Sequence, residues 1–406
     1  MSTNQRSSLW TRALLAVLAA QFLSALADNA LLFAALALLK QKSYPDWSVP
    51  LLQEFFVGAV ILLAPFSGPF ADSWPKGRVM LLSNGLKLLG ALGILAGMDP
   101  FLGYGIVGIG AATYAPAKYG ILSDLTTADR LVQANGLMES STIAAILIGA
   151  VLGGTLGDWN PHGALAAVVG CYAVAAIVNL FIPRIAPSHR LNRLTIVSML
   201  KDFGHAVRRL YAIHDARFAV GGTSLFWGAG STMRFLLIAW TPIALGIANT
   251  REPAYLNAVV AIGIVMGAAL AGKFVTLPTV NRALGGGIVL GFAVCVLVAV
   301  KNLHLAYGAL LVVGAAGGFF VVPLNALLQT KGHESTGAGH AVAVQNGFEN
   351  LSMLIMLGFY TMLVRVGVPI LTLVVCFGAF LALVIAVLWW YRVKKQRERA
   401  IQCQMA

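Results

Sequence analysis

Two ionisable residues, Asp28 and Arg234, lie deep inside long apolar segments of the chain. A charged side chain that faces lipid near the middle of a membrane costs several kcal/mol, about 2.5–3.5 on insertion scales. Asp28 is roughly 24 Å along its helix from Arg12. Arg234 is roughly 25 Å along its own helix from Arg217. We therefore predict that Asp28 and Arg234 lie at the same depth and form an ion pair between two halves of a membrane protein.

Three further charged residues interrupt apolar segments. Lys118 and Glu139 belong to the same, inner half of the membrane by their distance from the segment ends, and Glu349 lies nearer the middle. Lys118 therefore has two candidate acid partners, Glu139 and Glu349, and the sequence does not choose between them. Lys87 also lies in an apolar segment, but its long aliphatic stem can reach the membrane surface, and we interpret it as structural.

Amide and aromatic side chains at the same depths are candidates for contacts with a polar substrate. Amides both donate and accept hydrogen bonds, so they suit a polar group that carries charges of both signs. Tyr119 could cover a cavity wall, although core packing is the simpler explanation for it. The candidates of this kind are Asn29, Tyr119, Gln345, Asn346 and Asn350.

Residue types that could support enzyme chemistry have the wrong spacing. None of the seven histidines is followed five residues later by Asp, the spacing of an acyltransferase of the His-x4-Asp type. The sequence has no Gly-Lys-Ser/Thr loop to bind a nucleotide phosphate, which argues against ATP-driven transport. The four cysteines form no Cys-x-x-Cys pair, and no cluster of metal ligands stands out. We expect no catalytic residue, no metal site and no cofactor.

The elements that must position the charged residues are membrane-spanning helices. The chain has 406 residues, of which 59% are hydrophobic and 11% charged, and its mean hydropathy is +0.82. A soluble domain carries about 25% charged residues. At about 20 residues per span, the chain holds about a dozen spans with short loops. The apolar segments are residues 9–39, 51–72, 79–98, 101–122, 135–157, 162–182, 217–246, 255–276, 283–300, 304–329, 338–364 and 367–391.

These segments divide into six, a polar stretch and six more. We predict an N-terminal half at 1–182, a basic linker at 183–216 and a C-terminal half with a basic tail at 217–406. The first segment is too long for a cleavable signal peptide and is predicted to be the first span. Lys and Arg gather in the linker, at both termini and in the loops on their side, so we predict that both termini are cytoplasmic. The net charge of +13 is thereby explained by topology and does not indicate nucleic-acid binding.

Small residues recur at every fourth position along two of the predicted spans. The fifth span has Gly149, Gly153 and Gly157, and the eighth has Gly263 and Gly267. Such stripes let helices approach each other closely. Static helix packing is one explanation, and a seam between the two spans that parts sideways is the other.

The loop expected after the second span resembles the signature loop of the major facilitator superfamily. It has a glycine, an acid four residues later and a terminal Gly-Arg, namely Gly68, Asp72, Lys76, Gly77 and Arg78. The acid can cap a helix end while the bases pair across the cytoplasmic interface of the halves. With six plus six spans, this resemblance implies the major facilitator fold: an all-α integral membrane protein with twelve transmembrane helices in two six-helix halves.

Longer segments resemble the bacterial lysophospholipid transporter family, which belongs to the same superfamily. They lie in both halves, and together they cover nearly the whole chain. The segments are AQFLSALADNALL at 20–32, YAPAKYGIL at 114–122, ANGLMESST at 134–142, GTSLFWGAG at 222–230, GGFFVVPLNALLQ at 317–329 and VQNGFEN at 344–350.

That resemblance implies a function. Members of the family move lysophospholipids, such as lysophosphatidylethanolamine and lysophosphatidylglycerol, from the outer to the inner leaflet of the bacterial inner membrane. A cytoplasmic acyl-carrier-protein synthetase/acyltransferase then restores the missing acyl chain, and we expect that enzyme to be a separate protein here. The positions that match the family's intramembrane charged residues are Asp28, Lys118, Arg234 and Glu349.

Such a substrate favours lateral access from the lipid bilayer. Its head group needs charged and amide partners, whereas each methylene of its tail gains about 0.8 kcal/mol by staying in hydrocarbon. We therefore predict that the seam lined by the glycine stripes is a lateral portal. The main alternative is a proton-coupled multidrug or solute antiporter with Asp28 or Glu349 as the proton site. A lipid enzyme is a third alternative, which the histidine spacing disfavours.

Overall fold

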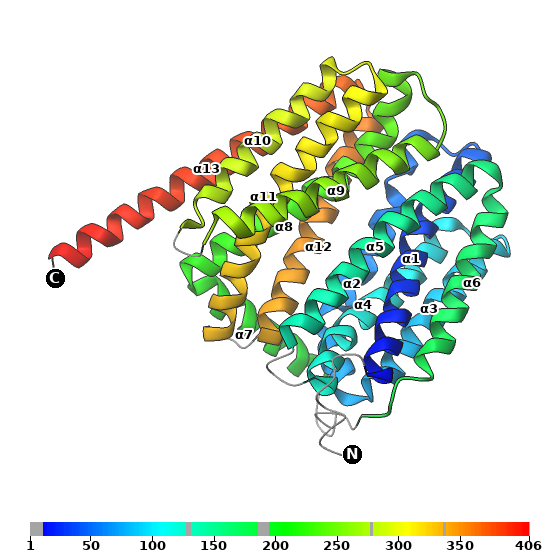
Figure 1. Ribbon diagram of the computed structural model, residues 1–406, viewed down its shortest axis with the longest axis horizontal. Coiled ribbons are helices and arrows are strands. Elements are labelled where there is room, and N and C mark those ends of the chain that lie inside the picture. Colours follow the sequence, from blue (N-terminus) through cyan, green and yellow to red (C-terminus); the bar gives the residue numbers. More distant parts are fainter. Residues whose placement is uncertain (1–10, 127–130, 186–194, 277–278, 336–337, 406) are drawn as a thin grey trace. The chain divides into compact units, whose positions relative to one another are not determined.

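The computed structural model describes residues 11–126, 131–185, 195–276, 279–335 and 338–405. These residues form α-helices joined by short turns, and no β-strand occurs among them (Figure 1). Ten helices in this part of the chain are long and apolar enough to cross a membrane. The helices α4 and α8, with 26 and 32 residues, are also long enough to cross a membrane. The prediction of an all-α integral membrane protein is confirmed.

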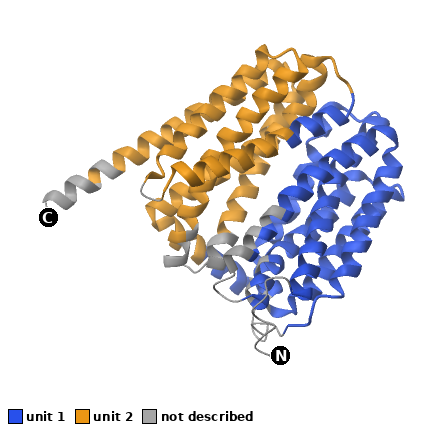
Figure 2. Cartoon of the chain, in the orientation of Figure 1, with its two compact units in different colours: residues 1–204, 249–258 blue, residues 205–248, 259–406 orange. Residues whose placement is uncertain are grey.

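The chain forms two compact units (Figure 2). Unit 1 comprises residues 1–204 and 249–258, and unit 2 comprises residues 205–248 and 259–406. The segment 249–258 therefore packs with unit 1, although it follows the first helix of unit 2 in the sequence. Hydropathy does not reveal that a segment of the second half packs with the first. The boundaries predicted at 182 and 217 stay a prediction.

Unit 1 is built around its first helix. Its elements are α1 (Arg12–Gln41), η2 (Asp46–Ser48), α2 (Leu51–Ser73), α3 (Lys76–Leu95), α4 (Pro100–Leu125), α5 (Leu131–Trp159) and α6 (Pro161–Asn179). The helix α1 is apolar on nearly all sides and packs against both α5 and α6, which buries most of its length (Figure 1). In the same unit α3 packs against α4 and α6, and α2 packs against α4.

Unit 2 repeats this arrangement. Its elements are α8 (His214–Leu245), α9 (Arg251–Phe274) after its first turns, α10 (Arg282–Val296), η4 (Leu297–Ala299), α11 (Leu303–Ser335), α12 (Ala338–Arg365) and α13 (Ile370–Met405). Here α8 packs against α12 and α13, α10 packs against α11 and α13, and α9 packs against α11. These pairs match those of unit 1 when α8 to α13 are aligned with α1 to α6. The match is the internal repetition of the major facilitator fold.

The described part of the predicted linker contains α7 (Ile196–Ala212) and the first turn of α8. Ala206 and Leu210 are buried on one face of α7, whereas Lys201 and Arg208 are exposed on the other. This distribution is that of an amphipathic surface helix rather than of a span.

The segment expected as a signature loop is almost entirely helical. Gly68 and Asp72 belong to the last turns of α2, and Lys76 begins α3. The Lys76 Nζ is 2.6 Å from Asp124 Oδ2 on α4 and donates to the carbonyl oxygen of Gly120 at 3.2 Å. Lys76 therefore pairs within unit 1, which corrects the expectation for this base, and the pairing of Arg78 stays a prediction.

The two residues that end the predicted signature have different surroundings. A Cβ at Gly77 would lie 2.9 Å from Cγ2 of Ile182, so a glycine at this position lets the start of α3 approach the chain that follows α6. Arg78 is exposed. The side chain of Asp72 lies outside the described residues, and its predicted capping role stays a prediction.

Candidate functional site

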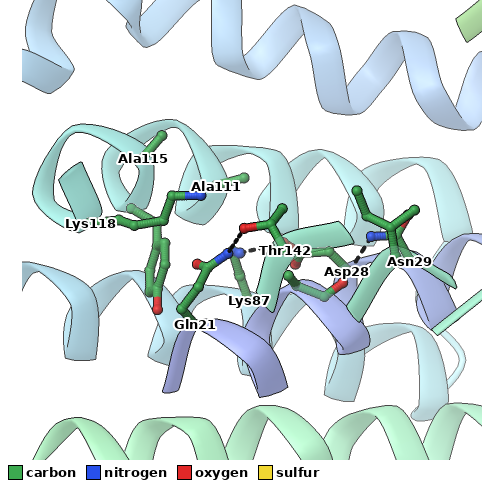
Figure 3. A pocket seen from close by; sticks show the side chains of 11 residues that line it. Gln21, Asp28, Asn29, Lys87, Ala111, Ala115, Lys118 and Thr142 are labelled. Atoms are coloured by element: carbon green, nitrogen blue, oxygen red, sulfur yellow. Dashed lines mark hydrogen bonds and ion pairs between the residues drawn. The ribbon is translucent and has the colours of Figure 1, made fainter. Parts of the chain in front are cut away.

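A polar cavity of about 200 Å³ lies within unit 1, where α1, α3, α4 and α5 meet (Figure 3). Alanine side chains at 25, 111 and 115 line part of its wall, so the polar groups are presented among small apolar neighbours. The polar side chains that line the cavity are Gln21, Asp28, Asn29, Lys87, Tyr114, Lys118 and Thr142.

Asp28 is held in the cavity wall by two other helices. The Lys87 Nζ on α3 is 2.7 Å from Asp28 Oδ2, and the Tyr172 hydroxyl on α6 donates to Asp28 Oδ1 at 2.7 Å. Hydrogen bonds to an ionised carboxylate are shorter and stronger than those between neutral groups. The Asp28 side chain nevertheless stays 24% exposed, so it is fixed in place and still faces the cavity.

Lys87 is turned inward, and the expectation that it reaches the membrane surface is wrong. Its side chain is 2% exposed, and its Nζ also donates to Ser24 Oγ at 3.0 Å. The Ser24 hydroxyl in turn donates to Asn84 Oδ1 at 2.7 Å. The Lys87 Nζ lies 4.9 Å from the ring centroid of Tyr114. Gly110 on α4 leaves room for the lysine stem, because a Cβ there would lie 2.7 Å from Lys87 Cγ.

The rest of the wall carries neutral hydrogen-bonding groups and a second base. The Gln21 Nε2 donates to Thr142 Oγ1 at 2.9 Å, which joins α1 to α5 (Figure 3). The Asn29 Nδ2 donates to the carbonyl oxygen of Ala25 in its own helix at 2.9 Å, so its side-chain oxygen remains as an acceptor. Lys118 on α4 lines the same cavity and is 7% exposed. The described residues of the cavity thus include the Asp28–Lys87 ion pair, the base Lys118 and several amide or hydroxyl groups.

Unit 2 contains a separate polar cluster on α11 and α12. Glu349 is 5% exposed, and the Gln345 Nε2 donates to Glu349 Oε1 at 2.7 Å. The same nitrogen donates to Asn325 Oδ1 at 2.8 Å. The Asn350 Nδ2 donates to the carbonyl oxygen of Asn346 in its own helix at 2.8 Å, and Asn346 is exposed. Of the predicted residues in this unit, the structure therefore brings Gln345 and Glu349 into direct contact.

Other predicted residues keep their status as predictions. The side chains of Tyr119 and Glu139 lie outside the described residues, and so the acid partner of Lys118 is not assigned. Arg234 lies half-buried on α8 in unit 2. Because Lys87 already compensates the charge of Asp28, an Asp28–Arg234 pair is not needed for that purpose.

The glycine stripes contact helices of their own units. On α5, a Cβ at Gly149 would meet the backbone oxygen of Leu26, and one at Gly153 would meet that of Ala30, both on α1. A Cβ at Gly157 would lie 3.1 Å from Cβ of Ala37, which is also on α1. The stripe on α5 therefore serves close packing against α1.

The stripe on α9 has the same role in unit 2. A Cβ at Gly263 would meet the backbone oxygen of Leu311, and one at Gly267 would meet that of Ala315, both on α11. The expectation that the two stripes face each other across a lateral seam is therefore corrected, because each packs against a neighbour within its own unit.

Removal of the Tyr172 hydroxyl provides a direct test of the Asp28 network. We expect Tyr172→Phe to lower the free energy of unfolding by about 1.5–3 kcal/mol, because a buried hydrogen bond to a charged group is lost. Denaturation in detergent would be compared for the single variant and for the same change in an Asp28→Asn background. An equal loss in both backgrounds would show that the hydroxyl does not act through Asp28.

Two six-helix units with one packing order and a polar cavity among the first helices define the class of a secondary transporter. The family model of the Major Facilitator Superfamily matches residues 17–357. The crystal structure of a POT family transporter in complex with 5-aminolevulinic acid superimposes with a TM-score of 0.79 at 12% identity. That match covers 96% of this chain and 98% of the other, and it supports the fold alone.

Two curated relatives are much more similar in sequence. The lysophospholipid transporter LplT of Escherichia coli O7:K1 is 55% identical over 392 residues, which cover 96% of this chain and 99% of the relative. The protein of the same name from Shigella dysenteriae serotype 1 is 54% identical over the same shares. The chain therefore belongs to the Major Facilitator Superfamily and, within it, to the family of these lysophospholipid transporters.

Proposed function

We propose that this protein carries lysophospholipids, such as lysophosphatidylethanolamine and lysophosphatidylglycerol, from the outer to the inner leaflet of a bacterial inner membrane. The similarity to the lysophospholipid transporters extends over nearly the full length of both chains. The single structural observation that carries the proposal is the cavity in unit 1, where charged side chains of both signs lie among amides and hydroxyls. Such a mixed wall suits a head group with a phosphate and either an ammonium or hydroxyl groups.

Each charged residue of the cavity has a proposed role. Lys118 lines the cavity from α4 and is proposed to attract the phosphate. The exposed part of the Asp28 carboxylate accepts from an ammonium or hydroxyl of the head group. Gln21 and Asn29 add hydrogen bonds that are insensitive to the sign of the charge. Arg234 and Glu349, on unit 2, are proposed to contact the head group at a later stage of alternating access.

Topology and partners complete the proposal. Both termini and the linker face the cytoplasm, as the distribution of Lys and Arg favours. The acyl tail stays in contact with lipid while the head group moves, because transferring each methylene to water costs about 0.8 kcal/mol. A separate cytoplasmic acyl-carrier-protein synthetase/acyltransferase consumes the product, so no nucleotide or ion gradient is needed for net transfer. The protein itself catalyses no covalent step.

Transport by the purified protein in liposomes tests the proposal. Fluorescent lysophosphatidylethanolamine in the outer leaflet becomes protected from a membrane-impermeant quencher when it is moved inward. We expect the protein to raise the initial rate above that of liposomes with a folded Asp28→Asn variant. We also expect an uncoupler to leave this rate unchanged, because both carboxylate oxygens of Asp28 already have partners in Lys87 and Tyr172.

Proton-coupled antiport is the second candidate, and one observation favours it. The partners that the structure describes for the buried carboxylate of Glu349 are the neutral side chains of Gln345 and Thr223. An acid in such surroundings is suited to bind and release a proton. Loss of the initial rate on collapse of the proton gradient would support this candidate and contradict gradient-independent transport.

A further inference from the structure

The side chain of Asp158, at the end of α5, caps the start of α9. Both of these segments belong to unit 1. The backbone N–H of Thr250 donates to Asp158 Oδ1 at 2.7 Å, and that of Arg251 donates to Asp158 Oδ2 at 2.6 Å. Asp158 lies one residue before the end of α5, and Arg251 is the first residue of α9. One carboxylate thus binds two of the backbone donors that the beginning of a helix leaves without partners in that helix.

Side-chain contacts extend this junction on both sides of the carboxylate. A Cβ at Gly154 would lie 2.6 Å from Cβ of Ala254, so α5 and α9 are in close contact one turn below the cap. The hydroxyls of Thr155 and Tyr255 are 3.4 Å apart. The Lys40 Nζ at the end of α1 donates to Thr250 Oγ1 at 3.3 Å. The start of α9 is therefore held by two helices of unit 1, at the membrane face opposite the N-terminus.

The rest of α9 belongs to unit 2. Residues 249–258 pack with unit 1, and the continuous helix then enters unit 2 at Val259. There Gly263 and Gly267 contact the backbone of α11 so closely that no side-chain atom fits between the helices. A relative movement of the two units must therefore break the junction at the start of α9 or the close packing of its remainder.

We propose that Asp158 is a gating residue, which clamps the start of α9 to α5 in one state of the transport cycle and releases it when the units move. The clamp is the weaker of the two contacts. Asp158 and Arg251 are exposed, so water can replace the carboxylate at the two backbone donors. Water cannot replace the contact of α9 with α11 in the same way, because there the buried backbone at Gly263 and Gly267 packs directly on the backbone of α11. The released end of α9 opens the head-group path between α5 and α9 at this face of the membrane.

Labelling of a buried cysteine tests release without using a substrate. Thr250 is 2% exposed, and Thr250→Cys would be introduced in a full-length chain whose four native cysteines are replaced by alanine. The rate of reaction with a membrane-impermeant thiol reagent would be normalised to that of Trp159→Cys, since Trp159 is 85% exposed beside Asp158. This normalisation removes the direct effect of the lost charge on thiol reactivity. We expect Asp158→Asn to raise the normalised rate about tenfold.

Asp99 provides the matched control. It is also exposed and also caps a helix, because its Oδ1 accepts from the backbone N–H of Phe101 at 2.9 Å, but that cap lies within a single turn before α4. Asp99→Asn is expected to leave the normalised rate unchanged. Equal rates for Asp158→Asn and the parent chain would overturn the proposal, as would an equal increase for Asp99→Asn.

A reversible cross-link gives a second test that does not depend on the folding of Asp158→Asn. Thr155→Cys and Tyr255→Cys would be joined by a short, cleavable bifunctional thiol reagent. This second test rests on the proposed function. Bridging is expected to lower the rate of lysophospholipid transfer about tenfold or more, and cleavage of the bridge is expected to restore the rate. Full transfer with the bridge closed would overturn the clamp. Absence of transfer before bridging would instead contradict the proposed function and leave the labelling result to decide on the clamp.

Discussion

Lys87→Met is expected to abolish lysophospholipid transfer and to destabilise the protein more than any other single change in the cavity wall. The substitution keeps most of the aliphatic stem but removes the Lys87 Nζ, which lies 2.7 Å from the Asp28 carboxylate in the native structure. Breaking a buried ion pair by removal of one partner costs about 3–5 kcal/mol. Thermal denaturation in detergent and transfer in liposomes would measure the two effects separately.

The double variant Asp28→Asn with Lys87→Met is the matched control. It removes both charges together, so we expect it to recover most of the lost stability while transfer stays absent. Recovery of transfer in the double variant would mean that the pair is structural and that the head group is bound elsewhere. A Lys87→Met protein with native stability and native transfer would contradict the ion pair itself.

Gly153→Leu is expected to reduce the folded yield and the melting temperature strongly. The Cβ of the new side chain would clash with the backbone oxygen of Ala30 on α1. Neither backbone can move away without separating α5 from α1, the most buried helix of unit 1. Overpacking of this kind costs about 1–3 kcal/mol when side chains can adjust, and we expect the upper end where the obstacle is backbone.

Gly170→Leu is the appropriate comparison. Gly170 lies on α6 of the same unit, is exposed, and has nothing within 4 Å of the position that a Cβ would take. We expect this change to leave the melting temperature within the error of the measurement. A stable Gly153→Leu protein that fails only in transfer would support the lateral seam predicted from the sequence and would contradict static packing against α1.

The depth of a residue could be predicted from the sequence, but the direction of its side chain could not. Asp28 was identified because an acid in a long apolar segment must face protein or water, and it does line a cavity. The same reasoning applied to Lys87, yet a flexible stem allowed the alternative that it reaches the membrane surface. What decides between them is the space beside Gly110, a property of how α3 and α4 pack, and not of the segment that contains Lys87.

The glycine stripes illustrate the same limit. Their four-residue spacing correctly predicted faces for close helix contact, but spacing does not identify the partner helix, which is α1 for Gly149 and Gly153. Tyr172 gave no signal, because an aromatic residue in an apolar helix is ordinary. Asp158 gave none either, since an acid at the end of an apolar segment is expected in water. Ten of the predicted spans, among the described residues, follow from composition and length alone.

The shared membership of α9 also has a consequence for how the protein is made. Unit 1 includes residues 249–258, which the ribosome supplies only after α8. Domains generally fold as units during synthesis, N-terminal ones first, but here the first six helices lack a part of their own unit when they are complete. Unit 1 therefore reaches its final packing beside Gly154 only when the second half has begun to insert, so the assembly of the first half depends on the second.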